Sequence, residues 1–347
     1  MTILFLTTSP APQFADTDAV FQEIATLREA FAGVEISITP ERTPAARYPR
    51  QLFGLHCLTD LWKAEAHTRV TQIFYPVLYC FPVLRWLRNP IVFTVTASVV
   101  RSRVPRGLRF LRKMHRVVVS NPRDEHKLRE WELPRVDVIR PGLDLDRFAA
   151  DVRARKRGST KLADGSFHLL MASAPWAERQ FDEKGVDALL GAVALAPHLS
   201  ATILLRGLFE SELRQRIGRL GIESRIRVVN EKVDVRDHLR AADAVILAAR
   251  RPDIVKTYPH SLIEALAAGK PVIISREIPM ADLVQDLGAG VVTDEIDAPA
   301  ILAAAISIME NRYRYLAGVR RFNPAMFSIS NLIDSYRKIY DDAAGAR

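Results

Sequence analysis

Short apolar runs alternate with amphipathic stretches along most of the chain. In the first half, runs rich in Val, Ile and Phe alternate with segments whose apolar residues recur at helical spacing. This alternation predicts a parallel sheet with helices on both faces. The predicted strands are 3–8, 34–38, 70–75, 91–95, 117–120 and 136–139, and the predicted helices are 16–31, 52–66, 77–87, 105–115 and 123–131.

The pattern breaks after residue 140 and restarts at Phe167. Between these points lie turn residues and then a charged segment that contains glycine, which is typical of a domain boundary. Two similar units without a short repeat predict two Rossmann-like α/β domains that face a cleft, divided at residue 145. In the second unit, the predicted strands are 167–172, 201–205, 226–229, 244–248, 272–274 and 289–292, and the predicted helices are 185–195, 211–220, 235–242, 261–268, 299–310 and 329–341.

Composition fits two globular domains. The chain has 347 residues, of which 48% are apolar and 26% are charged. Cys57 and Cys80 lie in apolar surroundings without metal-ligand spacing, so we expect reduced thiols in a cytoplasmic protein. The first residues lack a basic leader and enter a strand pattern directly, and no apolar run approaches about 20 residues.

The net charge of +9 favours an anionic partner such as a phosphate or a lipid surface. The segment Arg101–Arg116 holds seven basic residues and no acid. One interpretation is a helix at an anionic membrane surface, with Arg109, Arg112 and Arg116 facing lipid. The alternative is a helix packed on its own sheet with a solvated basic face. No motif of nucleic-acid recognition is present, so a nucleic-acid partner is not expected.

The stretch Ile254–Ser275 contains the clearest candidate site. A loop bounded by prolines precedes a short apolar helix that ends before Gly269, and a β-branched run follows. This order brings a helix N-terminus to the carboxyl edge of a sheet, where its N–H groups can bind a diphosphate. Glu264 would accept hydrogen bonds from hydroxyls nearby. The alternative is a capping box, with Glu264 folded back on the amide of Ser261.

Other candidate residues follow strands at the same predicted edge. Lys184-Gly185 begins a helix, so the ammonium could neutralise a phosphate, with Arg179 in the same loop; the alternative is a surface lysine. Arg206 is a weaker candidate, and the backbone up to Val233 could line a base pocket. The histidines lack metal-ligand spacing, so no metal site is expected. Nucleophile-elbow, P-loop and dinucleotide-binding motifs are absent from the sequence.

Several segments together resemble the retaining GT-B glycosyltransferases of the GT4 (group 1) family. The resemblance covers nearly the whole chain and is most specific in the second half. The segments are VTQIFYP, NPIVFTVTAS and the run 117–148 in the first half, and DEKGVDALLGA, HLRAADAVILAA, PHSLIEALAAGKPVIIS, IPMADLV and GAGVV in the second.

The resemblance implies roles for individual residues. Glu264 matches the last acid of the family's E-x₇-E motif, which holds the nucleotide ribose, and Lys184 matches the phosphate-binding lysine. Arg179 is the nearest candidate for the family's arginine. The amides around His260, Ser261 and Leu262 would meet the diphosphate. The resemblance also implies that a final helix, about 325–347, returns to the first domain.

The chain departs from the family pattern at three places. Lys256 stands where the family has the acid that contacts the transferred sugar, and Thr96 stands in place of a histidine near the reacting carbon. The Gly-Gly of the family's first loop is absent. Lys256 would suit a carboxylate-bearing sugar such as a uronic acid, contact the donor phosphates, or be a solvated lysine. A slipped alignment in which Asp253 replaces the missing acid is a further alternative.

The resemblance implies transfer of a sugar from a nucleoside-diphosphate sugar to an acceptor hydroxyl, with retention and without a metal or other cofactor. Glycan, glycolipid or cell-surface polysaccharide synthesis is the expected context, and a glycan or lipid-linked acceptor is the expected partner. The protein would be cytoplasmic and peripheral at the inner membrane face. The alternative from another class is a catalytically silent subunit that binds a nucleotide sugar, which Thr96 and Lys256 would favour.

Overall fold

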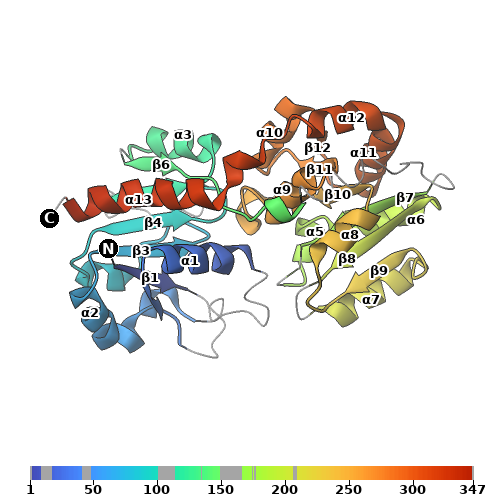
Figure 1. Ribbon diagram of the computed structural model, residues 1–347. Helices are drawn as coiled ribbons and strands as arrows, with labels where there is room; N and C mark the ends of the chain where they lie inside the picture. The colour runs from blue at the N-terminus through green and yellow to red at the C-terminus, as the bar shows by residue number, and fades with distance from the viewer. Residues whose placement is uncertain are drawn as a thin grey trace. The chain divides into compact units, whose positions relative to one another are not determined.

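The computed structural model describes residues 2–8, 18–40, 48–100, 114–133, 135–148, 166–173, 175, 177–205 and 209–345. The chain divides into two compact units (Figure 1). Unit 1 comprises Met1–Leu143 and Ala325–Arg347, and unit 2 comprises Asp144–Pro324. Each unit is built around its own parallel six-stranded sheet.

The sheet of unit 1 has the strand order β2-β1-β3-β4-β5-β6. Its central strands are fully buried, as expected for a parallel sheet covered on both faces. All six strands were predicted to within about two residues at their ends. They are β1 (Ile3–Thr7), β2 (Val34–Ser37), β3 (Val70–Tyr75), β4 (Ile91–Val95), β5 (Arg116–Val119) and β6 (Val136–Val138).

Side-chain caps begin two of the helices in unit 1. At the start of α1 (Ala19–Ala30), the Asp18 carboxylate accepts a hydrogen bond from the amide of Val20 at 2.9 Å. At the start of α3 (Pro122–Glu130), the Asn121 side chain accepts a hydrogen bond from the amide of Asp124 at 2.9 Å.

Two predicted helices of unit 1 are wrong in extent. The helix predicted from residue 52 begins only at Leu58, as α2 (Leu58–Ala66), because Gly54 at φ +82° interrupts the segment and 3₁₀ turns flank it. The helix predicted over 77–87 is reduced to one 3₁₀ turn, Pro82–Trp86.

The last helix of the chain packs into unit 1. This helix, α13 (Ile329–Gly345), carries the fully buried Tyr336 and Tyr340. The hydroxyl of Tyr336 lies 2.8 Å from that of Thr94, and the hydroxyl of Tyr340 donates to the side chain of Gln72 at 3.0 Å. α13 is therefore part of the core of unit 1.

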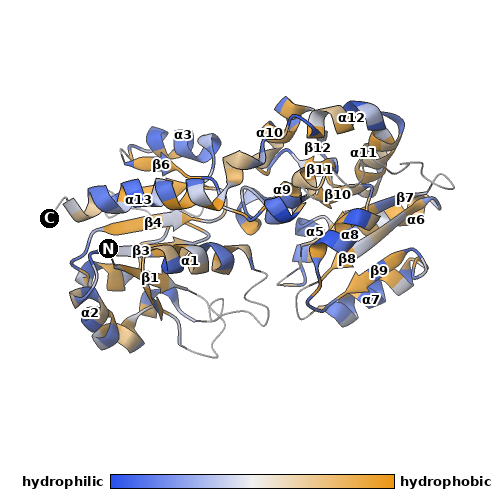
Figure 2. Ribbon diagram, in the orientation of Figure 1, coloured by the Kyte–Doolittle hydropathy of each residue, from blue (hydrophilic) through white to orange (hydrophobic). Residues whose placement is uncertain are grey.

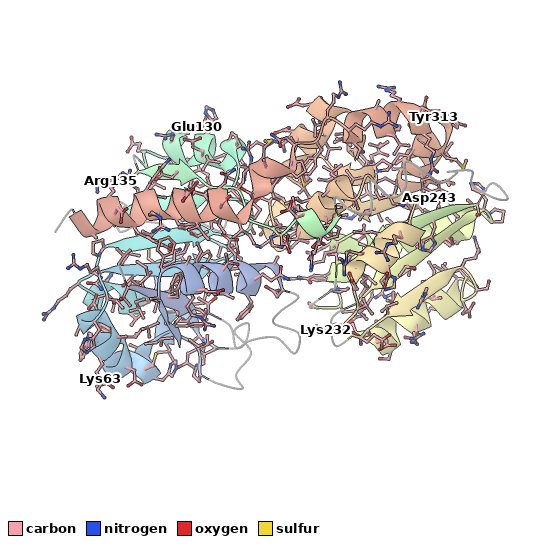
Figure 3. The ribbon with its side chains drawn as sticks, viewed as in Figure 1. Lys63, Glu130, Arg135, Lys232, Asp243 and Tyr313 are labelled. Atoms are coloured by element: carbon pink, nitrogen blue, oxygen red, sulfur yellow. The ribbon has the colours of Figure 1, made fainter. Side chains whose placement is uncertain are left out.

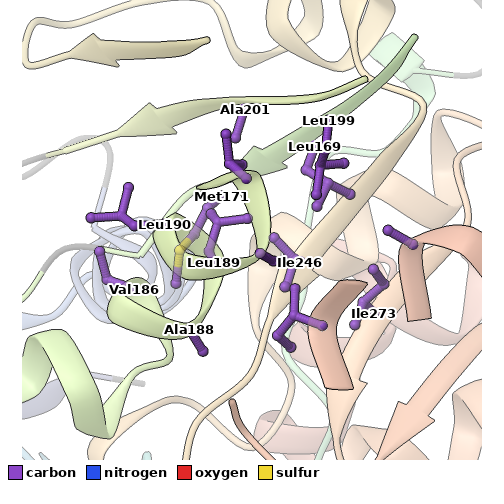
Figure 4. Close-up of a cluster of buried hydrophobic side chains, with 14 of the residues drawn as sticks. Leu169, Met171, Val186, Ala188, Leu189, Leu190, Leu199, Ala201, Ile246 and Ile273 are labelled. Carbon is purple, nitrogen blue, oxygen red and sulfur yellow. The ribbon is translucent and has the colours of Figure 1, made fainter. Parts of the chain in front are cut away.

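The sheet of unit 2 has the order β12-β11-β10-β7-β8-β9. Apolar side chains of its central strands and of α6 form one core (Figure 4), and the strands are largely apolar in Figure 2. The strands are β7 (Phe167–Met171), β8 (Leu199–Leu204), β9 (Ile226–Val229), β10 (Ala244–Leu247), β11 (Val272–Ser275) and β12 (Gly290–Thr293).

The helices of unit 2 include three that were not predicted, α5, α10 and α12. α5 is a single turn within a predicted loop, and α12 begins after one residue, Asn311, beyond the predicted helix 299–310. The helices are α5 (Gln180–Glu183), α6 (Val186–Leu195), α7 (Glu210–Arg219), α8 (Val235–Ala241), α9 (His260–Ala267), α10 (Met280–Leu287), α11 (Ala298–Glu310) and α12 (Arg312–Val319).

Each sheet has one topological switch point, where successive connections leave two neighbouring strands in opposite directions. It lies between β1 and β3 in unit 1 and between β7 and β10 in unit 2. In open parallel sheets, ligands bind at the carboxyl ends of the strands at such a point. The two switch points are therefore the first places at which to look for a site.

Candidate functional site

At the switch point of unit 2, the loops that follow β7 and β10 touch through their backbones. Gly185 has φ +72°, and a Cβ at this position would lie 2.3 Å from the carbonyl oxygen of Ala248. The amide of Arg250 donates to the carbonyl of Glu183 at 2.8 Å. A glycine is thus required at position 185 both by its left-handed conformation and by the close approach of the second loop.

Lys184 is buried next to this contact. It follows α5, and only 4% of its surface is exposed. Burial lowers the pKa of its ammonium to about 8, and the nearby Glu183 carboxylate partly opposes that shift. The group is still mostly protonated at pH 7, so a buried positive charge lies at the carboxyl edge of the sheet. An anion is the ligand that such a charge favours.

Ion pairs connect the two loops around Lys184. Glu183 lies 3.6 Å from the guanidinium of Arg179 and accepts from Arg251 at 3.3 Å. Arg251 also donates to both carboxylate oxygens of Asp253, at 3.1 and 2.9 Å. The Asp253 side chain is 2% exposed and held by this arginine, so the structure does not favour the alternative in which Asp253 replaces the missing sugar-binding acid.

The start of α9 decides between the two interpretations of Glu264. The N-cap is Pro259, without a side-chain hydrogen bond, and Ser261 is the second residue of the helix. The capping-box alternative is therefore wrong, because Ser261 is not the capping residue. The end of the helix is as predicted: Gly269 has φ +76°, and the amide of Lys270 donates to the carbonyl of Ala265 at 2.9 Å.

Glu264 instead pairs with a residue far away in sequence. Its Oε1 accepts a hydrogen bond from Nη2 of Arg147 at 3.0 Å, and its side chain is 13% exposed. Of the three predicted diphosphate amides, that of Leu262 already donates to the carbonyl of Pro259 at 3.1 Å, so it is not available as predicted. The roles of His260 and Ser261 stay predictions.

The remaining predicted residues are distributed over several elements. Lys256 is half-buried in the loop between β10 and α9, and Val233 lies next to Lys232 in the loop before α8 (Figure 3). Thr96, in unit 1, follows β4 and is 9% exposed, with its amide donating to the carbonyl of Tyr75 at 3.0 Å. Arg206 lies outside the described residues.

The predicted basic helix falls mostly outside the described residues. In its described part, residues 114 and 115 are not helical, and Arg116 begins β5. Arg116 pairs with Asp342 at 2.7 Å. The predicted place of Arg116 on a lipid-facing helix is therefore wrong, because the backbone there belongs to the sheet.

A cavity of about 560 Å³ lies between α8 and the adjoining strands. Inside it, the ring of His168 lies 2.9 Å from the hydroxyls of both Ser200 and Thr202. Burial lowers the pKa of His168. Of the predicted site residues that the structure describes, Val233 alone lines this cavity, which is otherwise formed by His168, Thr202, Arg227, Asp234, Asp237, His238 and Ala241.

Sequence reasoning missed Arg147 and Arg251. Each makes its contact across a long separation, 117 residues for Arg147 with Glu264 and 68 for Arg251 with Glu183. A local sequence pattern does not indicate either contact, because the partners lie on loops far apart in the chain. Among the described residues, no group of three or more potential metal ligands is present.

Known proteins resemble this chain in sequence and in structure. Residues 175–320 match the family model of glycosyl transferases group 1. The chain is 25% identical over 313 residues to the lipopolysaccharide core biosynthesis mannosyltransferase LpsB of Rhizobium meliloti (strain 1021), covering 80% of this chain and 78% of that protein. It is 30% identical to a D-inositol 3-phosphate glycosyltransferase of Geodermatophilus obscurus over 60% of this chain, and this match spans about half (47%) of that protein.

Solved structures resemble the chain over its whole length. A sucrose-phosphate synthase from Thermosynechococcus elongatus aligns with a TM-score of 0.73 at 17% identity, covering 100% of both chains. Anabaena HepE in complex with UDP and glucose aligns with a TM-score of 0.69 at 16% identity, covering 99% of this chain and all of the other. These matches and the two parallel sheets confirm the predicted GT-B fold class.

Proposed function

We infer the activity of this chain from its match to the family model of glycosyl transferases group 1 over residues 175–320. We propose that it transfers a sugar from a nucleoside-diphosphate sugar to an acceptor hydroxyl, with retention of configuration at the sugar. The observation that carries this proposal is the buried ammonium of Lys184 beside Gly185 at the switch point of unit 2. The UDP and UDP-glucose complexes of Anabaena HepE support the donor class.

In the proposed reaction, the bond between the sugar and the diphosphate breaks and negative charge grows on the departing phosphate. Lys184 and the amides of His260 and Ser261 would stabilise that charge, because fixed donors in a site of low polarity need no reorganisation during the reaction. Arg179, which is 68% exposed, would assist from the same loop. We propose that these groups make a metal unnecessary. The acceptor oxygen would form the new bond to the anomeric carbon, and its proton would pass to the leaving phosphate.

The nucleoside would lie along the same sheet edge. Glu264 would accept hydrogen bonds from the ribose hydroxyls. The backbone near Val233 would line the base pocket. The resemblance makes Lys256 in unit 2 a candidate for contact with the transferred sugar, and it makes the same suggestion separately for Thr96 in unit 1. Relatives that carry the names of a mannosyltransferase and of D-inositol 3-phosphate glycosyltransferases support sugar transfer in glycan or glycolipid synthesis as the broader context.

A second candidate function is a catalytically silent subunit that binds nucleotide sugars. Thr96 and Lys256 favour it, because they replace a histidine and an acid of the resembling family. The two functions share the donor site and differ in turnover. Slow hydrolysis of the bound donor in the absence of an acceptor would be expected only of the enzyme.

The test is a thermal-shift panel of UDP, GDP, ADP and their common sugar conjugates. A ligand present at 100 times its Kd adds about 2.7 kcal/mol to the free energy of unfolding, which is easily detected. Donor hydrolysis is then measured with the best ligand, with and without EDTA. Binding and hydrolysis that both survive EDTA support the metal-free enzyme. Loss of hydrolysis that magnesium restores would contradict the metal-free account, and binding without any turnover would favour the silent subunit.

The acceptor and the membrane partner stay proposals. We propose a glycan or lipid-linked acceptor and peripheral binding to an anionic membrane through residues 101–113, which lie outside the described part of the chain. Within the described part, no helix combines the length and the apolar character needed to span a bilayer.

A further inference from the structure

Arg147 links two parts of the proposed nucleoside site. Its Nη2 donates to Oε1 of Glu264 on α9 at 3.0 Å. The pKa of Asp234, at the start of α8, is lowered to about 2, mainly by hydrogen bonds from Arg236 and in smaller part by the charge of Arg147. The guanidinium of Arg147 therefore binds Glu264, the proposed ribose acid. Its charge also influences Asp234, which follows Val233 of the proposed base loop.

The position of Arg147 is fixed by its neighbour. Arg147 lies in a helical segment of which residues 146–148 are described, and its guanidinium carbon is 4.8 Å from the centre of the Phe148 ring. Phe148 is fully buried, and its amide donates to the carbonyl of Leu145 at 3.0 Å. The arginine side chain is 43% exposed, so its charged end remains accessible at the edge of the site.

The donor itself creates an electrostatic conflict at this site. A nucleoside diphosphate is an anion, and a carboxylate that binds its ribose brings a like charge within a few ångströms of the phosphates. A neighbouring cation removes most of that repulsion. A carboxylate has about four lone-pair sites, so it can accept from Arg147 and still accept from two ribose hydroxyls.

We propose that Arg147 is a positioning residue that compensates the charge of Glu264, so that a carboxylate can bind the ribose of an anionic donor. This inference rests on the proposed function, because it takes Glu264 as the ribose acid. It predicts a specific dependence on ligand charge. Loss of Arg147 weakens binding of a nucleoside diphosphate, whereas binding of the uncharged nucleoside changes little.

The experiment compares Arg147→Gln with the charge-retaining control Arg147→Lys. Binding is measured with whichever of UDP, GDP or ADP stabilises the parent most, and with the corresponding nucleoside by ligand-observed NMR. We expect Arg147→Gln to weaken diphosphate binding about tenfold, which corresponds to about 1.4 kcal/mol. Nucleoside binding should change less than about threefold, and Arg147→Lys should stay within about threefold of the parent for both ligands.

A double-mutant cycle shows whether Arg147 acts through Glu264. In a Glu264→Gln background the repelling charge is gone, so Arg147→Gln should weaken diphosphate binding less than about threefold. An equal loss in both backgrounds would overturn the proposal, because Arg147 would then act on the phosphates directly. Tighter diphosphate binding by Arg147→Gln would also overturn it, since the arginine would then block the site. If the parent binds none of the nucleotides, the proposed function itself fails, and this inference falls with it.

Discussion

The two switch points have the same topological origin and different chemistry. In unit 2, the loops after β7 and β10 hold a buried lysine and several arginine–carboxylate pairs. In unit 1, the corresponding region is aromatic: Arg50 lies over the rings of Tyr75 and Tyr79, at 5.8 and 5.6 Å, and Phe53 stacks on Phe81 with ring centres 5.1 Å apart. The topology thus provides two equivalent edges, and in the described part of the chain the buried ammonium lies at the edge of unit 2.

This difference supports the proposal that the donor binds to unit 2, and it leaves the chemistry of unit 1 more open. The loop after β3 in unit 1 is described, whereas residues 9–17, after β1, lie outside the described part. Phe53, Phe81 and Tyr75 are buried, so these rings belong to the core of unit 1. The predictions below test the assignment by changing unit 2 and using sites elsewhere as controls.

The largest effect is expected at Gly185. Gly185→Ala adds a methyl group 2.3 Å from the carbonyl of Ala248 at a position with φ +72°, so it should lower the free energy of unfolding by about 3 kcal/mol and weaken donor binding. The control is Gly221→Ala, at φ +65° with open space around it, which should cost only about 1 kcal/mol and leave donor binding unchanged. Chemical denaturation measures both; equal costs would show that the two loops do not approach closely.

The next effect concerns the buried charge of Lys184. Lys184→Met should weaken binding of a nucleoside diphosphate by about 2 kcal/mol or more, because a charge-assisted contact is lost. The same substitution should stabilise the ligand-free protein by about 1 kcal/mol, since burying an ammonium is unfavourable. Arg50→Met in unit 1 is the matched control and should leave nucleotide affinity unchanged. A Lys184→Met protein that binds the donor normally would remove the main difference between the two switch points.

Lys184 also predicts a dependence on pH. Its pKa is about 8 in the folded protein and about 10.5 when unperturbed, so the unfolded state binds more protons between these values. The free energy of unfolding should therefore rise as the pH rises from about 8 to about 10.5. As the pH falls back through this range to about 8, that gain is lost. Donor affinity should fall above about pH 8 as the ammonium loses its proton. Denaturation and binding measured from pH 7 to 10 test both trends, which should be absent in Lys184→Met.

Glu264→Gln should weaken donor binding by about 2 kcal/mol, because an amide is a poorer acceptor for ribose hydroxyls than a carboxylate is. Unfolding should change much less, since the pair with Arg147 is partly exposed. Glu223→Gln, at an exposed acid of the same unit, is the control and should alter neither. A variant that loses stability and keeps its donor affinity would place Glu264 outside the donor site.

The smallest expected effect is a change of preference at Lys256. If its ammonium meets a carboxylate-bearing sugar, the parent should prefer a uronic-acid donor over the matched neutral donor, and Lys256→Glu should reverse this preference by about 1 kcal/mol or more. Competition between the two donors measures the ratio directly. A parent that prefers the neutral hexose would leave a phosphate contact or simple exposure as the explanation of Lys256.

The sequence predicted the strands well and the site contacts poorly, for a physical reason. The local sequence predicts buried parallel strands, because both of their faces are apolar. It also predicts the end of α9, because Gly269 favours the left-handed conformation found there. The contacts of Arg147 and Arg251 depend on how loops far apart in sequence meet in the fold. The start of α9 was ambiguous as well, since S-x-x-E fits both a cap and a site, and only the position of Pro259 as N-cap decides.

The packing of α13 has a consequence for how the protein is made. Unit 2 is one continuous segment, Asp144–Pro324, whereas the core of unit 1 includes Tyr336 and Tyr340 from the far end of the chain. During synthesis, the first 143 residues leave the ribosome with a gap in their core that is filled only when α13 emerges. Chaperone dependence and sensitivity to truncation should therefore concentrate in unit 1, while unit 2 can complete its own fold earlier.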